Sequence, residues 1–216
     1  MKVSYNSKTE KYSISNMATD EFSALFCVLD IADSQCFKEE NEEGLFESGD
    51  GFLLLLNKRQ RRGLTNVVNE IKTNPTSRRL VISGWNPVQM PEMCLPPCHV
   101  LYQFYVDNGK LSCQMYQRSA DLFLGLPFNI ASTTLLTYII ASMTNYNVGK
   151  VRICIGDAHI YSEHIPNILE QITRCPLEFP KLVIKNKKET LEDWIFEDFS
   201  IENYRAHEAL KSKMIA

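Results

Sequence analysis

At 216 residues, with 44% hydrophobic and 23% charged residues, the chain has the size and composition of one soluble globular domain. Its net charge of −3 carries no basic surplus of the kind that marks general nucleic-acid binding. Its longest apolar runs, such as Phe52–Leu56, are far too short to cross a bilayer, and the polar start Met1–Tyr12 has no signal-peptide core. We therefore expect neither a nucleic-acid nor a membrane partner.

The first part of the chain gives few structural signals. Met1–Ser15 is polar and predicts no element. Thr19–Ala32 is predicted to be a helix or a buried strand, and its length favours the helix. The acidic segment Lys38–Asp50 is typical of a solvated loop, and Gly51–Leu56 resembles a buried strand.

The middle of the chain alternates short predicted elements with proline-rich segments. The basic cluster Lys58–Arg62 is interpreted as a solvated face, with phosphate binding as the less favoured alternative. Leu64–Lys72 has the apolar spacing of a helix, which Asn74-Pro75 should end. Leu80–Gly84 is predicted to be a short strand, and Pro87–Pro97 to be irregular.

A β-hairpin is the strongest local prediction. Two alternating runs, His99–Val106 and Leu111–Arg118, flank the segment Asp107–Lys110, which contains an Asn-Gly pair. Alternation on both sides of Asn-Gly is typical of two strands joined by a tight turn.

Helices and strands are predicted in turn after the hairpin. Ile130–Thr144 should form a mostly buried helix with Asn129 available as its N-cap. The remaining predicted elements are a strand at Val151–Ile155, a helix at Glu163–Thr173, and strands at Lys181–Ile184 and Phe199–Tyr204. The expected fold class is therefore α+β, with a mixed β-sheet backed by helices.

A reactive thiol is the main chemical hypothesis that the residues themselves suggest. The predicted strand pair carries Cys98 near one end and Arg118 near the other. An arginine close to a cysteine favours the thiolate, which is the nucleophilic form of the side chain. This arrangement suggests covalent chemistry on an anionic substrate.

The cysteine pattern favours a reduced, intracellular protein. The chain has seven cysteines, an odd number, and their spacing fits no zinc-binding pattern. Cys94 and Cys98 would be metal ligands only if a second pair lay nearby. We expect no bound metal and a cytoplasmic location.

From Asn74 onward the chain strongly resembles the thymidylate synthase family. The matching segments are long, ordered and correctly spaced: Ser77–Asn86, Leu95–Val106, Leu111–Ser132, Gly156–Tyr161, Phe179–Lys185 and Phe196–Tyr204. The resemblance implies a single domain over residues 1–216, with a divergent part at 1–63 and a nucleotide- and folate-binding part at 64–216. It also implies a dimer whose interface is one face of the sheet.

The resemblance implies that the chain converts deoxyuridylate (dUMP) to thymidylate (dTMP). In the family, a thiolate adds to C6 of uracil so that C5 becomes nucleophilic, and 5,10-methylenetetrahydrofolate supplies the one-carbon unit and then the hydride. Cys98 matches this nucleophile; as a lone cysteine it would more often be a buried structural residue. The co-product is dihydrofolate.

The resemblance also assigns the contacts to deoxyuridylate. Arg118 and Ser119 match phosphate-binding residues, and Arg78 and Arg79 match the pair contributed by the neighbouring subunit. Asn129 matches the residue that reads the uracil edge, where relatives acting on cytosine carry aspartate. The other expected substrate residues are Gln117, Asp121, His159 and Tyr161, and His99 is expected to support the site.

The folate co-substrate is expected beside the nucleotide. Asp121 resembles the residue that bonds the pterin, and Trp85 is expected to flank the pocket. Leu95, Gly125 and Phe128 would line it. The end of the chain, Met214–Ala216, resembles a tail that closes over the ligands and includes the expected folate contacts Ile215 and Ala216.

Residues 1–60 leave two alternatives open. Relatives carry an arginine on an N-terminal loop and a glutamate on an early helix, and residues 1–60 contain neither motif. One alternative is therefore a deoxyuridylate-binding paralogue with little or no turnover that acts as a dimer partner or regulator. The other is a pyrimidine nucleotide hydroxymethylase, in which water replaces hydride as the final acceptor; Asn129 argues against its cytosine version.

Overall fold

The computed structural model describes the backbone of residues 2–6, 11–15, 58–88 and 96–215, and the side chains of residues 62–88 and 96–215. The predictions for Thr19–Ala32, Lys38–Asp50 and Gly51–Leu56 lie outside these residues. A two-stranded antiparallel sheet pairs β1 (Lys2–Asn6) with β2 (Lys11–Ser15), where the sequence predicts no element.

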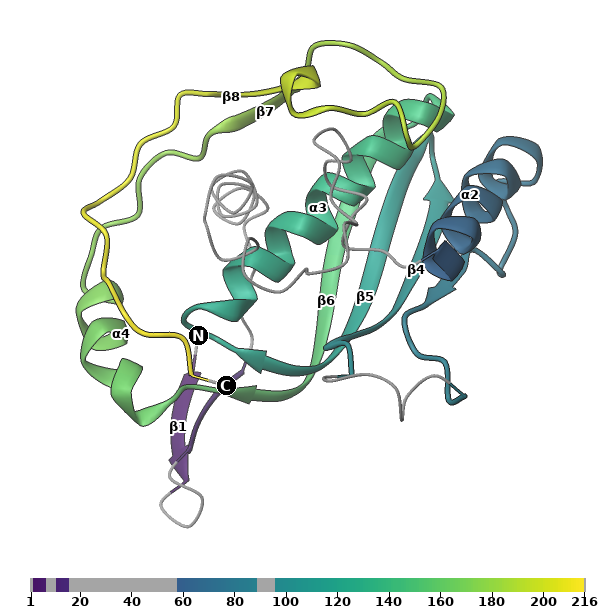
Figure 1. The fold of residues 1–216 in the computed structure, drawn as a ribbon. Helices are drawn as coiled ribbons and strands as arrows, with labels where there is room; N and C mark the ends of the chain where they lie inside the picture. Colours follow the sequence, from purple (N-terminus) through teal and green to yellow (C-terminus); the bar gives the residue numbers. More distant parts are fainter. Residues whose placement is uncertain (1, 7–10, 16–57, 89–95, 216) are drawn as a thin grey trace, which may run out of the picture.

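A four-stranded mixed sheet organises the fold (Figure 1). Its strands lie in the order β3 (Val81–Ser83), β4 (His99–Asp107), β5 (Lys110–Asp121) and β6 (Asn147–His159). The first three are antiparallel, whereas β6 runs parallel to β5 because the helix α3 (Gly125–Thr144) returns the chain between them. The predicted α+β class, with a mixed sheet backed by helices, is confirmed.

The predicted hairpin is also confirmed. Its turn consists of Asn108 and Gly109, with φ values of 47° and 72°, between the paired residues Asp107 and Lys110. Two successive positive φ values match the turn twist that joins antiparallel strands most directly, which is why an Asn-Gly pair suits this position. The turn sets the register of β4 against β5 from the Asp107–Lys110 pair to the Leu101–Tyr116 pair, and an irregularity between His99 and Leu101 then shifts it by one residue.

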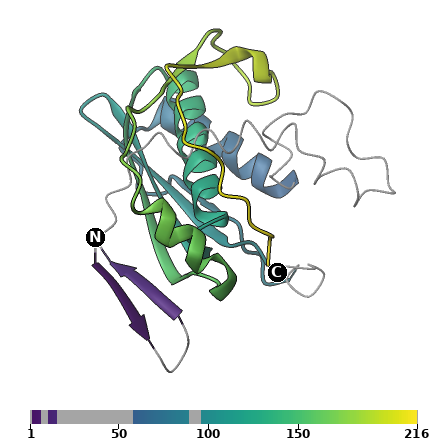
Figure 2. The same ribbon diagram turned by 90° about the vertical axis from the view of Figure 1, so that its left-hand side faces the viewer.

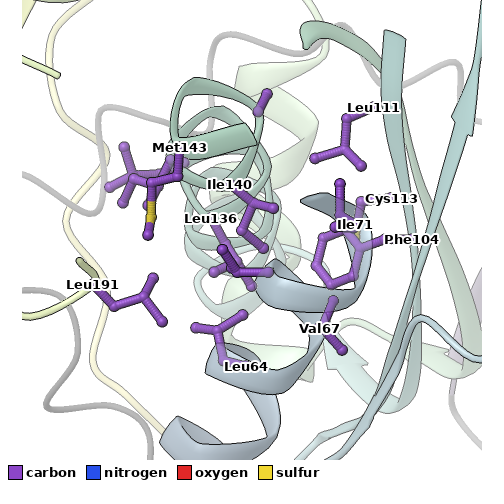
Figure 3. Close-up of a cluster of buried hydrophobic side chains, with 14 of the residues drawn as sticks. Leu64, Val67, Ile71, Phe104, Leu111, Cys113, Leu136, Ile140, Met143 and Leu191 are labelled. Carbon is purple, nitrogen blue, oxygen red and sulfur yellow. The ribbon is translucent and has the colours of Figure 1, made fainter. Parts of the chain in front are cut away.

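Two helices pack on the same face of this sheet (Figures 1 and 2). The helix α2 (Lys58–Thr73) buries the apolar stripe predicted for it, which consists of Leu64, Val67, Val68 and Ile71. It begins at Lys58 rather than Leu64, because the Lys, Arg and Gln residues of the basic cluster are good helix formers. Figure 3 shows three residues of this stripe, Leu64, Val67 and Ile71, facing Phe104 and Cys113 of the sheet and Leu136 and Ile140 of α3.

The helix α3 is the core helix of the fold. It begins at Gly125 rather than Ile130, so the prediction that Asn129 is its N-cap is wrong. Asp121 accepts hydrogen bonds from backbone N–H groups just before the helix, at Phe123 and Leu124, and the Asn129 side chain is used elsewhere. By length and composition alone α3 could cross a membrane, but 67% of its most apolar window is buried inside the protein, as expected of a core helix.

The opposite face of the sheet carries exposed apolar and aromatic side chains. Val81, Tyr105 and Tyr116 are 43%, 62% and 41% exposed, on three adjacent strands. Strand residues alternate between faces, so β5 directs Gln117 toward α3 and Arg118 toward this uncovered face.

The C-terminal part runs alongside α3 from one end of that helix to the other (Figure 1). After β6 the chain forms a short turn, η4 (Ser162–His164), and the helix α4 (Ile165–Gln171), in place of the single helix predicted at Glu163–Thr173. β7 (Lys181–Ile184) pairs with β8 (Phe199–Glu202) across the turn η5 (Phe196–Asp198). The yellow segment in Figures 1 and 2 then returns past α4.

Gly156 is the glycine whose replacement should disturb both the fold and the site strand. A Cβ atom there would lie 2.9 Å from the Arg118 carbonyl oxygen and 2.9 Å from the Tyr116 hydroxyl. Because the first of these atoms is backbone, Gly156→Ala is expected to lower the free energy of unfolding by about 1–3 kcal/mol. Urea denaturation would measure this loss.

Gly63→Ala is the matched control. A Cβ atom at Gly63 would have its nearest neighbour at 3.9 Å, within a helix where alanine is favoured over glycine. We expect this variant to be as stable as the original chain or more stable. Equal stabilities for the two variants would contradict the close approach of β6 to β5.

Candidate active site

The strand register gathers most of the predicted site residues at one end of the sheet. His99 at the start of β4 pairs with Gln117 near the end of β5, and Asp121 at the end of β5 pairs with His159 at the end of β6. The Arg118 N–H donates to the Cys98 carbonyl at 2.9 Å, so the β4–β5 ladder continues to the predicted nucleophile. Residues distant in sequence thus meet at one edge.

Arg118 is held against the segment that leads into Cys98. Its guanidinium donates to the carbonyls of Pro96, at 2.7 Å from Nη2, and Pro97, at 3.3 Å from Nε. The indole Nε1 of Trp85 donates to the same Pro97 carbonyl at 2.9 Å. These bonds fix the Pro-Pro segment and leave other guanidinium donors available for an anion.

The buried Gln117 side chain orients Asn129. Its Nε2 donates to the Ser119 carbonyl at 2.9 Å and to Asn129 Oδ1 at 2.7 Å. A carbonyl only accepts, so the Ser119 contact identifies the donor end of Gln117 and requires Asn129 to present its oxygen there. The Asn129 amide nitrogen therefore points away from Gln117, and its oxygen keeps a second lone pair.

One imidazole and two thiols in and beside the hairpin differ in their surroundings. Burial lowers the pKa of His99, so its ring is neutral near pH 7. Burial also raises the pKa of the Cys113 thiol to about 12, which keeps that cysteine protonated and unreactive. Cys98 is half-buried and forms no disulfide.

Asp121 shapes the turn between β5 and α3. Its carboxylate accepts from the N–H groups of Phe123 at 3.0 Å and Leu124 at 3.3 Å. The Leu122 N–H donates to the His159 carbonyl at 2.9 Å, so this turn is also bonded to the end of β6. The predicted pterin residue is thus held in a fixed position.

His159 and Tyr161 form a compact group at the end of β6. The His159 Nδ1 lies 3.0 Å from Asp157 Oδ1, and the His159 and Tyr161 rings meet edge-on at 5.1 Å. The carboxylate orients the imidazole, because it fixes which ring nitrogen carries the proton. The sequence analysis did not single out Asp157, although its spacing of two residues from His159 places both on one face of the strand.

The predicted folate residues are placed only in part. Gly125 and Phe128 lie in the first turns of α3, both half-buried, and Ile215 is half-buried near the end of the chain. Leu95 and Ala216 lie outside the described residues.

Arg78 and Arg79 are not brought to this end of the sheet. Both are exposed and precede β3, whose residue Val81 pairs with Gln103, well along β4 from Cys98. Because β3 runs antiparallel to β4, the two arginines lie toward the Asp107 end of the sheet. They are therefore separated from the site of their own chain.

His164 is a buried polar residue that the sequence analysis missed. It is 1% exposed and lies beside Tyr161, Phe123 and Asp121. No local pattern identifies it, because its contacts come from three separate segments. Among the residues that the structure describes, no group of three or more His, Cys, Asp or Glu side chains is arranged to hold a metal ion.

The sequence of the chain is similar to those of a known protein family and of curated proteins. Residues 34–216 match the protein family described as thymidylate synthase. The curated thymidylate synthases of Listeria monocytogenes serotype 4a and Listeria innocua serovar 6a are each 52% identical to this chain over 149 residues. Those residues are 69% of this chain and 48% of each relative, so the chain spans about half the length of the curated relatives it matches.

Proposed function

The chain belongs to the thymidylate synthase family, and from this premise we propose that it methylates deoxyuridylate to thymidylate with 5,10-methylenetetrahydrofolate. The observation that carries the proposal is the meeting of Cys98, Arg118 and the Gln117–Asn129 pair at one end of the sheet. At that end a thiol is available for the uracil ring, a cation for the phosphate and an amide for the edge of the base. The hydrogen-bonded backbone of the sheet holds all three in fixed positions.

Cys98 is the proposed nucleophile. Its thiolate adds to C6 of the uracil ring, and the electron pair of the C5–C6 double bond moves toward the O4 carbonyl, which makes C5 nucleophilic. The folate co-substrate supplies the one-carbon unit to C5, and the C5 proton is lost to solvent. Hydride from the folate then reduces the one-carbon unit to a methyl group, and the thiolate leaves C6 as the C5–C6 double bond re-forms. The bonds to the Pro96 and Pro97 carbonyls hold the thiol's segment in place for both steps.

Arg118 and Ser119 are the proposed phosphate contacts. The guanidinium is already oriented by two carbonyls, so binding an anion costs little additional side-chain entropy. The half-buried Ser119 is two residues further from the turn on the same strand as Gln117. Its hydroxyl is proposed as a neutral donor to the same phosphate.

Asn129 is proposed to select uracil over cytosine. The bond from Gln117 fixes the direction of its amide, with the nitrogen free to donate to O4 and the oxygen able to accept from N3–H. Gln117 therefore acts as an orienting residue. His159 and Tyr161, ordered by Asp157, are proposed to bind the deoxyribose hydroxyl.

The folate is proposed to bind against Asp121 and the first turns of α3. The carboxylate is held by two backbone N–H groups and is 17% exposed, so it can accept further hydrogen bonds from a heterocycle. Trp85, Gly125, Phe128 and Ile215 are the other proposed contacts, with Leu95 and Ala216 outside the described residues.

We further propose that the protein acts inside the cell, where Cys98 stays reduced. We also propose that it forms a symmetric dimer through the uncovered face of the sheet. Exposed Tyr105 and Tyr116 on that face are costly to leave in water, and Arg118 points to the same face. A two-fold contact there would let Arg78 and Arg79, which lie away from their own site, serve the partner's phosphate.

Mixing two inactive variants should restore activity if the sites are shared. In a dimer of Arg79→Glu with Cys98→Ala, one site has an intact thiol and intact partner arginines. We expect an equimolar mixture, after subunit exchange, to recover up to about a quarter of the original turnover. Mixing either variant with itself should recover none, and failure of the heterologous mixture would contradict the shared site.

The function itself is tested by incubating the protein with deoxyuridylate and methylenetetrahydrofolate and following dihydrofolate by absorbance. Thymidylate should form in equal amount, measured by chromatography. Binding of deoxyuridylate without dihydrofolate formation would identify a non-catalytic protein. One-carbon transfer without dihydrofolate would identify a hydroxymethylase.

A further inference from the structure

His164 occupies a buried position between the C-terminal segment and the turn that carries Asp121. It is 1% exposed, and its ring lies 5.2 Å from Phe123 and 5.7 Å from Tyr161. Its Nε2 lies 2.9 Å from the Lys213 carbonyl oxygen, forty-nine residues later in the chain. A buried imidazole with this contact is a tertiary connection between two parts of the proposed folate site.

The contact determines which ring nitrogen carries the proton. A backbone carbonyl only accepts, so Nε2 must donate to Lys213. Nδ1 then faces Asp121, whose Oδ1 lies 3.9 Å away, and it has no hydrogen-bond partner in the described part of the chain. Donation to Lys213 is thus the hydrogen bond that holds the His164 ring in place.

His164, Asn167 and Arg174 each bond the returning C-terminal segment, and of these contacts the one from His164 lies furthest along it. Arg174 donates to the Glu208 carbonyl at 2.6 Å, and Asn167 donates to the Lys211 carbonyl at 3.1 Å and the Ser212 hydroxyl at 2.6 Å. Asn167 and Arg174 are half-buried, whereas the His164 side chain is only 1% exposed. The residue that His164 contacts, Lys213, comes immediately before Met214, which is 78% exposed. The contact therefore lies at the start of the tail that is expected to close.

We propose that His164 is a positioning residue that anchors the closing tail at Lys213 next to Asp121. This inference rests on the proposed function, because Asp121 and Ile215 are the proposed folate contacts. The hydrogen bond fixes Lys213 beside the turn proposed to bind the pterin. Met214 and Ile215 then move relative to this fixed residue when the tail closes. Loss of the anchor should therefore weaken folate binding while leaving the nucleotide site, which lies around Arg118 and Asn129, unchanged.

A matched pair of variants separates the two ring nitrogens. In His164→Gln the amide nitrogen falls near the position of Nε2 and can still donate to Lys213, whereas in His164→Asn it falls near Nδ1 and cannot reach. Hydrogen exchange of the C-terminal peptide in the unliganded full-length protein would compare them. We expect exchange at the tail amides to accelerate about tenfold in H164N and to remain near the original rate in H164Q.

Steady-state kinetics test the link to folate. H164N is expected to raise the KM for methylenetetrahydrofolate about tenfold, with deoxyuridylate affinity by calorimetry changed less than about twofold. H164Q should restore the KM. Asn167→Ala, which removes two contacts of the same segment away from Asp121, is the control and should change the folate KM far less.

Three results would overturn the assignment. They are equal tail exchange in H164N and H164Q, equal folate KM values in H164N and N167A, or a parallel loss of deoxyuridylate affinity in H164N. If the original protein shows no turnover with deoxyuridylate, the proposed function fails. The exchange comparison of H164N with H164Q still decides whether His164 anchors the tail, because it requires no ligand.

Discussion

Replacing Cys98 by alanine is expected to abolish dihydrofolate formation, with a fall in turnover of at least about 10⁴-fold. The other thiol of the hairpin, Cys113, cannot replace it, because burial raises the pKa of that thiol to about 12 and keeps it protonated. Without covalent addition at C6, C5 of uracil has no route to nucleophilic character. The absorbance assay with deoxyuridylate and methylenetetrahydrofolate measures the loss.

The same variant should still bind its nucleotide. The contacts that hold Arg118 are backbone carbonyls of Pro96 and Pro97, and the Asn129 amide is held by Gln117, so none of them depends on the thiol. Calorimetry of Cys98→Ala with deoxyuridylate is expected to give an affinity within a few-fold of the original, roughly 1 kcal/mol. Cys175→Ala, which removes an exposed thiol, is the control and should turn over normally. Appreciable turnover by Cys98→Ala would rule out the proposed covalent mechanism.

Asn129→Asp should reverse the choice of base. A carboxylate accepts from Gln117 as the amide oxygen does, so the local packing is kept. It cannot donate to O4 of uracil, and it places a negative charge beside that oxygen, whereas the amino group of cytosine can donate to it. We expect kcat/KM for deoxyuridylate to fall by about 10³-fold or more and deoxycytidylate to become the preferred nucleotide.

Competition between the two nucleotides measures this change directly. Asn145→Asp adds the same charge at the exposed C-terminal end of α3, where Asn145 has a left-handed backbone conformation that aspartate also tolerates. That control should keep the preference for deoxyuridylate. Retention of the preference in Asn129→Asp would show that another residue reads the base.

The elements that the sequence predicted well are those with strong local patterns. The Asn108-Gly109 turn, the apolar stripe of α2 and the strand at Lys181–Ile184 all follow from short-range signals, and the structure confirms each of them. The start of α3 was predicted too late, because Asn129 resembles an N-cap in sequence. In the structure the Asp121 carboxylate accepts hydrogen bonds from N–H groups of the turn before α3. The Asn129 side chain instead accepts a hydrogen bond from Gln117.

The sequence proposes the residues of the candidate site but does not reveal the contacts between them. Resemblance to a family names Cys98, Arg118 and Asn129, yet it does not reveal that Arg118 binds the Pro96 and Pro97 carbonyls or that Gln117 orients Asn129. His164 could not be found from sequence, because its burial arises where three distant segments meet. Such contacts depend on tertiary packing, which no local periodicity encodes.

The hairpin turn at Asn108-Gly109 has a consequence for how this chain can tolerate insertions. It lies at the opposite end of the sheet from Cys98, yet it joins β4 to β5 and sets the register that, after the irregularity between His99 and Leu101, places His99 opposite Gln117. Adding or deleting one residue there would move β5 by one position and exchange its two faces. Gln117 would then point away from α3, and Arg118 would point into it. Length at this distant, exposed loop is therefore as strictly constrained as the identity of the reactive residues.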